Sequence, residues 1–130
     1  MTDATVPRRK VGWLVYAAAL TVFVVIGEAR NVVASPRIDA VVLADWVLSL
    51  VLLVALWGYA LQRPIGSPGY WRVVFWIVLA ATVIMLVPVA VGPLEAIVFT
   101  AVLIAIVAPA YLAAYLYGHR SARLWNPPQT

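Results

Sequence analysis

The chain has no cysteine and only one histidine among its 130 residues. The lack of cysteine excludes disulfide bonds, thiolate catalysis and cysteine-ligated metal or iron–sulfur sites. The lone histidine, His119, excludes a haem held by two histidines of this chain. An HExxH motif, a glycine-rich phosphate loop and a serine with a plausible base beside it are also missing. We therefore predict a protein that is not an enzyme and holds neither a metal nor a cofactor.

Charged residues are scarce as well. Asp, Glu, Lys and Arg make up 11% of the chain, whereas about 25% is typical of soluble domains. This shortage excludes a water-soluble globule, a disordered tail and a nucleic-acid-binding domain, despite the formal net charge of +4.

Long apolar runs take the place of the missing charges, because 65% of the residues are hydrophobic. A membrane-spanning helix needs about 20 apolar residues, and residues 11–33, 40–62, 73–91 and 96–117 each form such a run. These runs lack the polar–apolar alternation of a barrel strand, so we expect helices. The first run is too long for a cleaved signal. We predict one membrane domain, with residues 1–10 and 119–130 as tails.

Short connections with turn-forming residues separate the four runs. Ser35-Pro36 lies in the first connection, residues 63–69 form the second, and Gly92-Pro93 lies in the third. Short links make consecutive helices antiparallel. The predicted fold class is therefore all-α, an integral membrane four-helix up-down-up-down bundle.

The basic residues predict the orientation of this bundle. Seven Lys and Arg residues lie on the side of the two termini and the second connection, and two lie on the other side. Because cytoplasmic loops carry an excess of Lys and Arg, we expect both termini in the cytoplasm of a bacterium and the helices in its plasma (inner) membrane. The lipid bilayer is the first expected partner, with anionic lipids at the cytoplasmic face. The seven are Arg8, Arg9, Lys10, Arg63, Arg72, Arg120 and Arg123.

Tryptophan and tyrosine are distributed just as unevenly. All of them fall towards the cytoplasmic side except Trp46. Amphipathic rings collect at headgroup depth, which favours an aromatic belt at one interface. An aromatic-lined pocket that opens to the cytoplasm is the alternative. The cytoplasmic set is Trp13, Tyr16, Trp57, Tyr59, Tyr70, Trp71, Trp76, Tyr111, Tyr115, Tyr117 and Trp125.

Most of the acidic residues lie on the opposite, outer side. Glu28, Asp39, Asp45 and Glu95 fall there, together with the two remaining arginines, Arg30 and Arg37. Glu28 follows 17 uncharged residues and Asp45 precedes 17, so each lies roughly 26 Å from the inner boundary at 1.5 Å per residue. Because their helices are adjacent and antiparallel, the two carboxyl groups can approach each other.

Two carboxylates at matched depth indicate a shared proton or cation site. Asn31 follows Glu28 by three residues and Ser49 follows Asp45 by four, so each can add an oxygen on the same helical face. We favour a structural interpretation over such a site, since side chains this close to the boundary can reach water or pair with the arginines of the first connection. Arg37 is the better such partner, for Asp39 or Asp45.

The last run carries two rows of small residues at helical spacing. One row is Ala101, Ala105 and Pro109, and the other is Ala110, Ala114 and Gly118. Small residues let helix backbones approach closely in lipid. We favour packing within the bundle over contact with another protein for both rows.

These features favour a small non-enzymatic membrane protein that acts through helix association, as a homo-oligomer or as a subunit with other membrane proteins. The alternative function is a small cation- or proton-coupled transporter or channel that uses Glu28 and Asp45. Nothing in the sequence indicates binding to nucleic acid.

Overall fold

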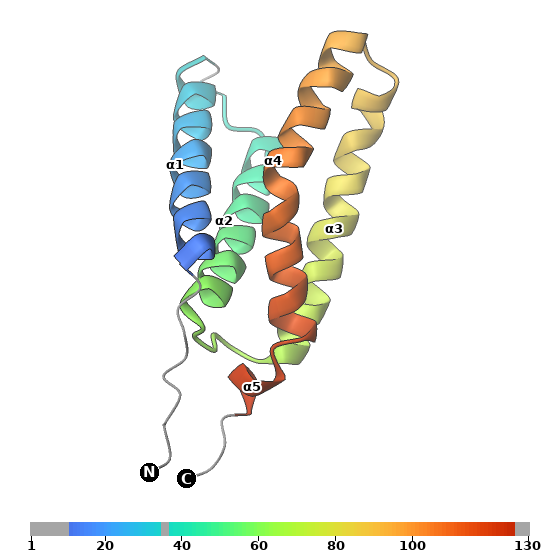
Figure 1. Ribbon diagram of the computed structural model, residues 1–130. Coiled ribbons are helices and arrows are strands. Elements are labelled where there is room, and N and C mark those ends of the chain that lie inside the picture. Colours follow the sequence, from blue (N-terminus) through green and yellow to red (C-terminus); the bar gives the residue numbers. More distant parts are fainter. Residues whose placement is uncertain (1–10, 35–36, 127–130) are drawn as a thin grey trace, which may run out of the picture.

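A computed structural model describes residues 11–34 and 37–126 of the chain. Within these residues the fold is all-helical (Figure 1), and four of its helices are long and apolar enough to cross a membrane. The elements are α1 (Val11–Ala34), α2 (Ala40–Leu61), α3 (Pro68–Ala90), α4 (Leu94–His119) and the short α5 (Ala122–Trp125). The four predicted spans correspond to α1–α4.

The start of α3 differs from the sequence prediction, which placed Pro68 and Gly69 in the second connection and began the span at Val73. The helix begins at Pro68, after Ser67 in an extended conformation, and the Ser67 hydroxyl accepts a hydrogen bond from the Tyr70 N–H at 3.3 Å. Proline fits the first turn of a helix because the N–H that it lacks has no helical partner there. Pro68 therefore begins the helix instead of ending a turn.

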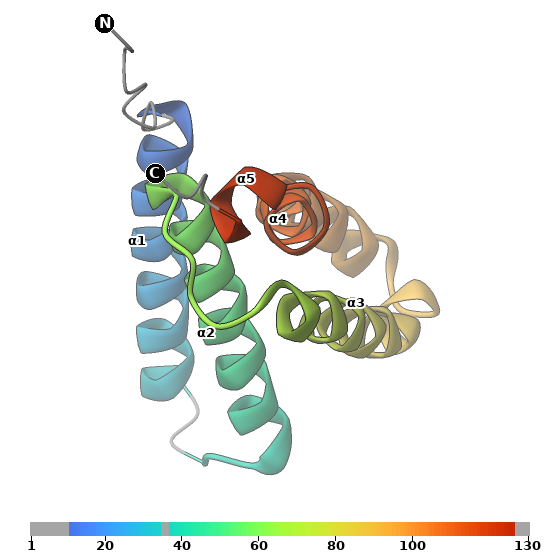
Figure 2. The ribbon, with the colours of Figure 1, turned by 90° about the horizontal axis from the view of Figure 1, so that it is seen from below.

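The helices form two pairs of neighbours. In the first pair α1 runs antiparallel to α2, because Trp13 contacts the ring of Tyr59 while the Trp57 indole donates a hydrogen bond to Thr21 further along α1. In the second pair α3 runs antiparallel to α4, because Arg72 at the start of α3 donates to the Gly118 carbonyl while Thr82 further along α3 is bonded to Tyr111, which precedes Gly118. The two pairs meet where α2 packs on α4. Figure 2 shows that they meet at one end and diverge towards the other.

The core lies at the end where the pairs meet. Most of the buried hydrophobic residues come from the second half of α2, the start of α3 and the second half of α4, with two from α1. We call this region the closed end and the opposite region, where the pairs diverge, the open end. The core residues are Ala17, Leu20, Leu52, Ala55, Leu56, Tyr59, Ala60, Trp71, Ala110, Ala113, Ala114 and Tyr117.

Two glycines allow the close approach of helices at the closed end. A Cβ at Gly58 of α2 would lie 2.8 Å from the ring of Tyr117, and a Cβ at Gly118 of α4 would lie 3.2 Å from the backbone of α3 at Trp71. Real Cβ atoms do not tolerate the first of these distances without displacement of the ring. Gly58 therefore makes room for the largest fully buried side chain, Tyr117.

Hydrogen bonds fix the connection between α2 and α3 to this core. The Tyr117 hydroxyl donates to the Arg63 carbonyl at 2.7 Å and accepts from the Ile65 N–H at 2.8 Å. The Trp71 indole donates to the Ile65 carbonyl. One side chain from α4 and one from α3 thus supply the partners that the backbone of a connection otherwise takes from water.

The segment after α4 is more ordered than a frayed tail. The Trp125 indole donates to the Tyr117 carbonyl at 2.9 Å, and the Ser121 hydroxyl donates to the Leu116 carbonyl at 2.9 Å. The sequence predicted a tail over residues 119–130, because the segment ends in Asn126-Pro127-Pro128. Side-chain bonds to the last carbonyls of α4 hold the segment through Asn126 instead.

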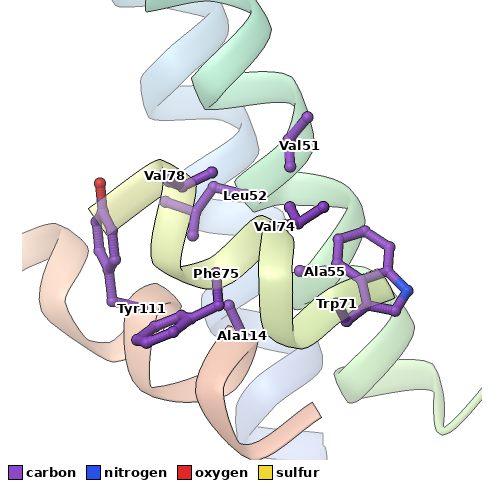
Figure 3. A pocket seen from close by; sticks show the side chains of 9 residues that line it. All are labelled: Val51, Leu52, Ala55, Trp71, Val74, Phe75, Val78, Tyr111 and Ala114. Carbon is purple, nitrogen blue, oxygen red and sulfur yellow. The ribbon is translucent and has the colours of Figure 1, made fainter. Parts of the chain in front are cut away.

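The aromatic residues of this end do more than form an interfacial belt, since Tyr59, Trp71 and Tyr117 are buried. Figure 3 shows apolar side chains of α2, α3 and α4, together with Tyr111, around a gap in this region. The gap has a volume of about 10 Å³, which at most admits one water molecule. It therefore offers no room for a ligand.

Candidate functional site

The open end brings together the last turns of α1 and the first turns of α2. There the Trp46 indole donates a hydrogen bond of 2.6 Å to a carboxylate oxygen of Glu28, whose side chain is half-buried. Sequence reasoning missed this role of Trp46. The available signal was its position, because it is the one tryptophan on the outer side and directly follows Asp45.

The structure places Glu28 and Asp45 next to each other. Their carboxyl groups are close enough to interact through a side-chain hydrogen bond and through charge. Both also line a hollow of about 520 Å³ between α1, α2 and α3, and Asn31 lines it with them. Three residues of the predicted polar cluster therefore share one cavity.

A second hollow lies between α2, α3 and α4 and has a volume of about 500 Å³. Asp45 lines this hollow too, and so does Ser49, one turn further along α2. The Asp45 side chain is exposed. Its carboxylate is therefore accessible where the two hollows meet.

The inner part of the second hollow contains a short chain of hydroxyl groups. The Thr82 hydroxyl donates to the Val78 carbonyl at 2.8 Å and is also bonded to the Tyr111 hydroxyl. Because the Thr82 proton goes to the carbonyl, Tyr111 is the donor to Thr82. The protons of both hydroxyl groups are therefore already used in hydrogen bonds within the protein, so neither hydroxyl is available as a donor to a ligand.

The other predicted acidic residues have different positions. Asp39 caps α2, and one of its carboxylate oxygens accepts from the N–H groups of Val41 and Val42 at 3.1 and 2.9 Å. Glu95 is exposed in the first turn of α4, where a negative charge is favourable next to the helix N-terminus. Neither residue lines the two hollows.

The arginines of the outer side form no ion pair with Glu28 or Asp45 in the described part of the chain. Arg30 and Arg37 are both exposed. Among residues 11–34 and 37–126, no ion pair joins either arginine to Glu28, Asp39 or Asp45. The pairing with Arg37 that the sequence offered as an alternative is therefore not formed in the part of the chain described.

The two small-residue rows of α4 are used differently. Ala110, Ala114 and Gly118 are buried at the closed end, as expected for packing within the bundle. Ala101 and Ala105 are exposed in the open half. Pro109, the third member of this row, is half-buried, so burial within the bundle is not observed for Ala101 and Ala105.

The acidic pair can hold a proton or a cation between two oxygens. In the described ranges, no three His, Cys, Asp or Glu side chains gather as ligands for a metal ion. The polar groups that line the two hollows are carboxylates, hydroxyls and an amide, beside apolar walls.

The chain matches no protein-family model, no curated protein and no solved structure.

Proposed function

We propose that the chain is a non-enzymatic protein of a bacterial inner membrane that acts through association of its helices with other membrane proteins or with copies of itself. Four apolar helices support its place in the bilayer. The observation that carries association is the contrast within α4. Its row of Ala110, Ala114 and Gly118 is buried against the bundle, whereas Ala101 and Ala105 present an equally small surface to the outside.

Leucine at Ala105 tests the association. Small residues let helices approach closely in lipid, and a larger side chain prevents this approach. We expect Ala105→Leu to lower the mass of the gently solubilised particle towards that of the monomer. Ala18→Leu is the matched control, because Ala18 is exposed on α1 away from this row. A parent protein that is already a monomer and copurifies with nothing would contradict the proposal.

The closed end is the cytoplasmic end in this proposal. It carries Arg63, Arg72 and Arg120, and the bias of Lys and Arg over the whole sequence favours the same orientation. These arginines would also face the anionic headgroups of the inner leaflet. Cysteine labelling tests the orientation, because the chain has no native cysteine. Ser35→Cys should react with an impermeant reagent on intact cells and Ser67→Cys should not, and the opposite pattern would reverse the orientation.

A second candidate function is transport or conduction of a proton or small cation through the Glu28–Asp45 pair. The observation that favours it is the juxtaposition of the two carboxyl groups in a hollow without an arginine partner among the described residues. Ionisable groups at this depth in a membrane protein commonly belong to ion or proton pathways.

Proteoliposome flux measurements test this second candidate. Glu28→Gln and Asp45→Asn should abolish coupled flux while the protein keeps its helical content. Glu95→Gln is the matched control, because it removes an acid from the same side but outside the hollows. Flux that is unchanged in both variants of the pair, or absent from the parent protein, would rule the candidate out.

A further inference from the structure

The hollow between α2, α3 and α4 combines apolar walls with acceptor oxygens. Most of its lining is aliphatic, including Leu48, Leu79, Leu103 and Val107. Along α2 it extends from Asp45 to Leu52, which is roughly 10 Å at 1.5 Å per residue. Its volume of about 500 Å³ lies within the range of about 300–1,000 Å³ for small-molecule sites.

The polar groups of this hollow are suited to a hydrogen-bond donor with a positive charge. Thr82 and Tyr111 bond to each other, which leaves the Asp45 carboxylate and the hydroxyls of Ser49 and Thr100. An ionised carboxylate is an acceptor only, and Glu28 adds a second carboxyl group beside it. The electrostatic character of this end of the hollow is therefore that of a cation site.

The apolar walls distinguish between kinds of cation. A calcium ion takes about six to eight oxygen ligands, and magnesium keeps several waters. Asp45 in the lining of the hollow and Glu28 beside it do not supply such a shell, and the described residues contain no group of three metal-ligating side chains. An ammonium group needs only a few acceptors, and an apolar body attached to it would occupy the aliphatic part.

We propose that this hollow binds an amphiphilic amine, with its ammonium group on Asp45 and its apolar body between α2, α3 and α4. The charge complementarity of Asp45 and Glu28 selects a cation, and the aliphatic lining selects an organic one. The proposal rests on the second candidate function, whose acidic pair it uses, and it names the class of ligand for that pair.

Equilibrium binding of octylammonium tests the proposal, because an octyl chain matches the length of the hollow. The full-length protein is placed in phosphatidylcholine nanodiscs, and binding is measured as the excess over empty discs. We expect saturable binding of about one octylammonium per chain. Octanol and octyl sulfate, which have the same tail without the positive charge, should not compete. No saturable excess, or equal competition by octyl sulfate, would overturn the proposal.

Two kinds of variant place the ligand. Asp45→Asn removes the charge and should weaken binding about tenfold or more, as expected for a bond to a charged group. Ser49→Phe and Thr100→Phe fill the hollow from different helices and should weaken binding by a similar factor, provided that helical content is unchanged. Glu95→Gln should bind as the parent does. Unchanged binding in Asp45→Asn, or in both filled variants, would show that the amine does not occupy this site.

Other occupants give different results. A bilayer lipid or a second copy of the chain that fills the hollow would leave no saturable site for octylammonium, and the second copy would also double the mass of the particle; either outcome overturns the proposal. Flux that depends on the acidic pair without octylammonium binding would retain the second candidate function and reject the amine. Binding that depends on Asp45 without any flux would retain the amine site and reject transport.

Discussion

The two ends of the molecule are built on different principles. At the closed end, glycine and alanine let α2, α3 and α4 approach, and Tyr117 joins α4 to the connection between α2 and α3. At the open end the helix pairs diverge, two hollows of about 500 Å³ each lie there, and Glu28, Asp45, Asn31 and Ser49 line them. Close packing of the helices thus stabilises the closed end. The open end, where this packing is lacking, is accessible to a ligand or a partner.

This difference separates stability from function along the same four helices. A change at the closed end removes packing contacts, or hydrogen bonds to the backbone, that exist only in the folded protein, and it therefore lowers the free energy of unfolding. A change at the open end affects side chains that are already exposed or half-buried. We therefore expect matched substitutions at the two ends to have unequal effects on the free energy of unfolding.

The largest difference is expected between Gly58→Ala and Gly27→Ala. The new Cβ at Gly58 would lie 2.8 Å from the Tyr117 ring, whereas a Cβ at Gly27 would meet nothing within 4 Å. Overpacking costs about 1–3 kcal/mol, and we expect a loss of about 3 kcal/mol at Gly58. Gly27→Ala should be neutral or slightly stabilising. Reversible unfolding in mixed micelles measures both, and equal effects would contradict the contrast between the ends.

Removal of one hydroxyl group tests the closed end more finely. Tyr117→Phe leaves the Arg63 carbonyl and the Ile65 N–H without their partner, and we expect a loss of about 2 kcal/mol. Tyr115→Phe is the control, since its hydroxyl has no hydrogen bond among the described residues. The same unfolding experiment applies, and a Tyr117→Phe variant as stable as Tyr115→Phe would show that the bonds contribute nothing.

A smaller effect is expected from the cap of α2. Asp39→Ala removes the acceptor for two N–H groups, which typically costs about 1 kcal/mol. Asp39→Asn should retain most of the stability, because asparagine is an equally good N-cap residue. Hydrogen exchange at Val41 and Val42 should rise in the alanine variant only. Faster exchange in both variants would indicate that the charge, and not the cap, matters.

The smallest effect is expected from Trp46→Phe. This change removes the hydrogen bond to Glu28, but the groups lie at the open end, so a loss of about 0.5 kcal/mol is expected. Trp76→Phe, on an exposed face of α3, is the matched control. A loss at Trp46 as large as that in Tyr117→Phe would mean that the open end contributes as much to stability as the closed end.

The sequence predicted the number and the approximate bounds of the long helices because length and apolar composition suffice for a membrane span. It missed the first turn of α3, since Ser67-Pro68-Gly69 is typical of both a turn and a capped helix start. The order of the segment after α4 depends on Trp125 and Tyr117, which meet only in the folded chain.

The candidate site was predicted in part for a similar reason. Matched depth on antiparallel helices was enough to expect that Glu28 and Asp45 approach each other. Depth does not specify the direction of a side chain, so the role of Trp46 and the capping role of Asp39 emerged only with the contacts. The hollows depend on the divergence of the helix pairs, which no local pattern in the sequence encodes.

The difference between the closed and the open end is tested most directly by measuring the distance between α2 and α4 at each end, with the protein in lipid nanodiscs. Because the chain has no cysteine, spin labels can be attached uniquely at Leu61 and Arg120 of the closed end, or at Leu43 and Phe99 of the open end. We predict a distinctly longer distance for the Leu43–Phe99 pair than for the Leu61–Arg120 pair. Equal distances would show that the bundle closes at both ends in a bilayer and would contradict the account.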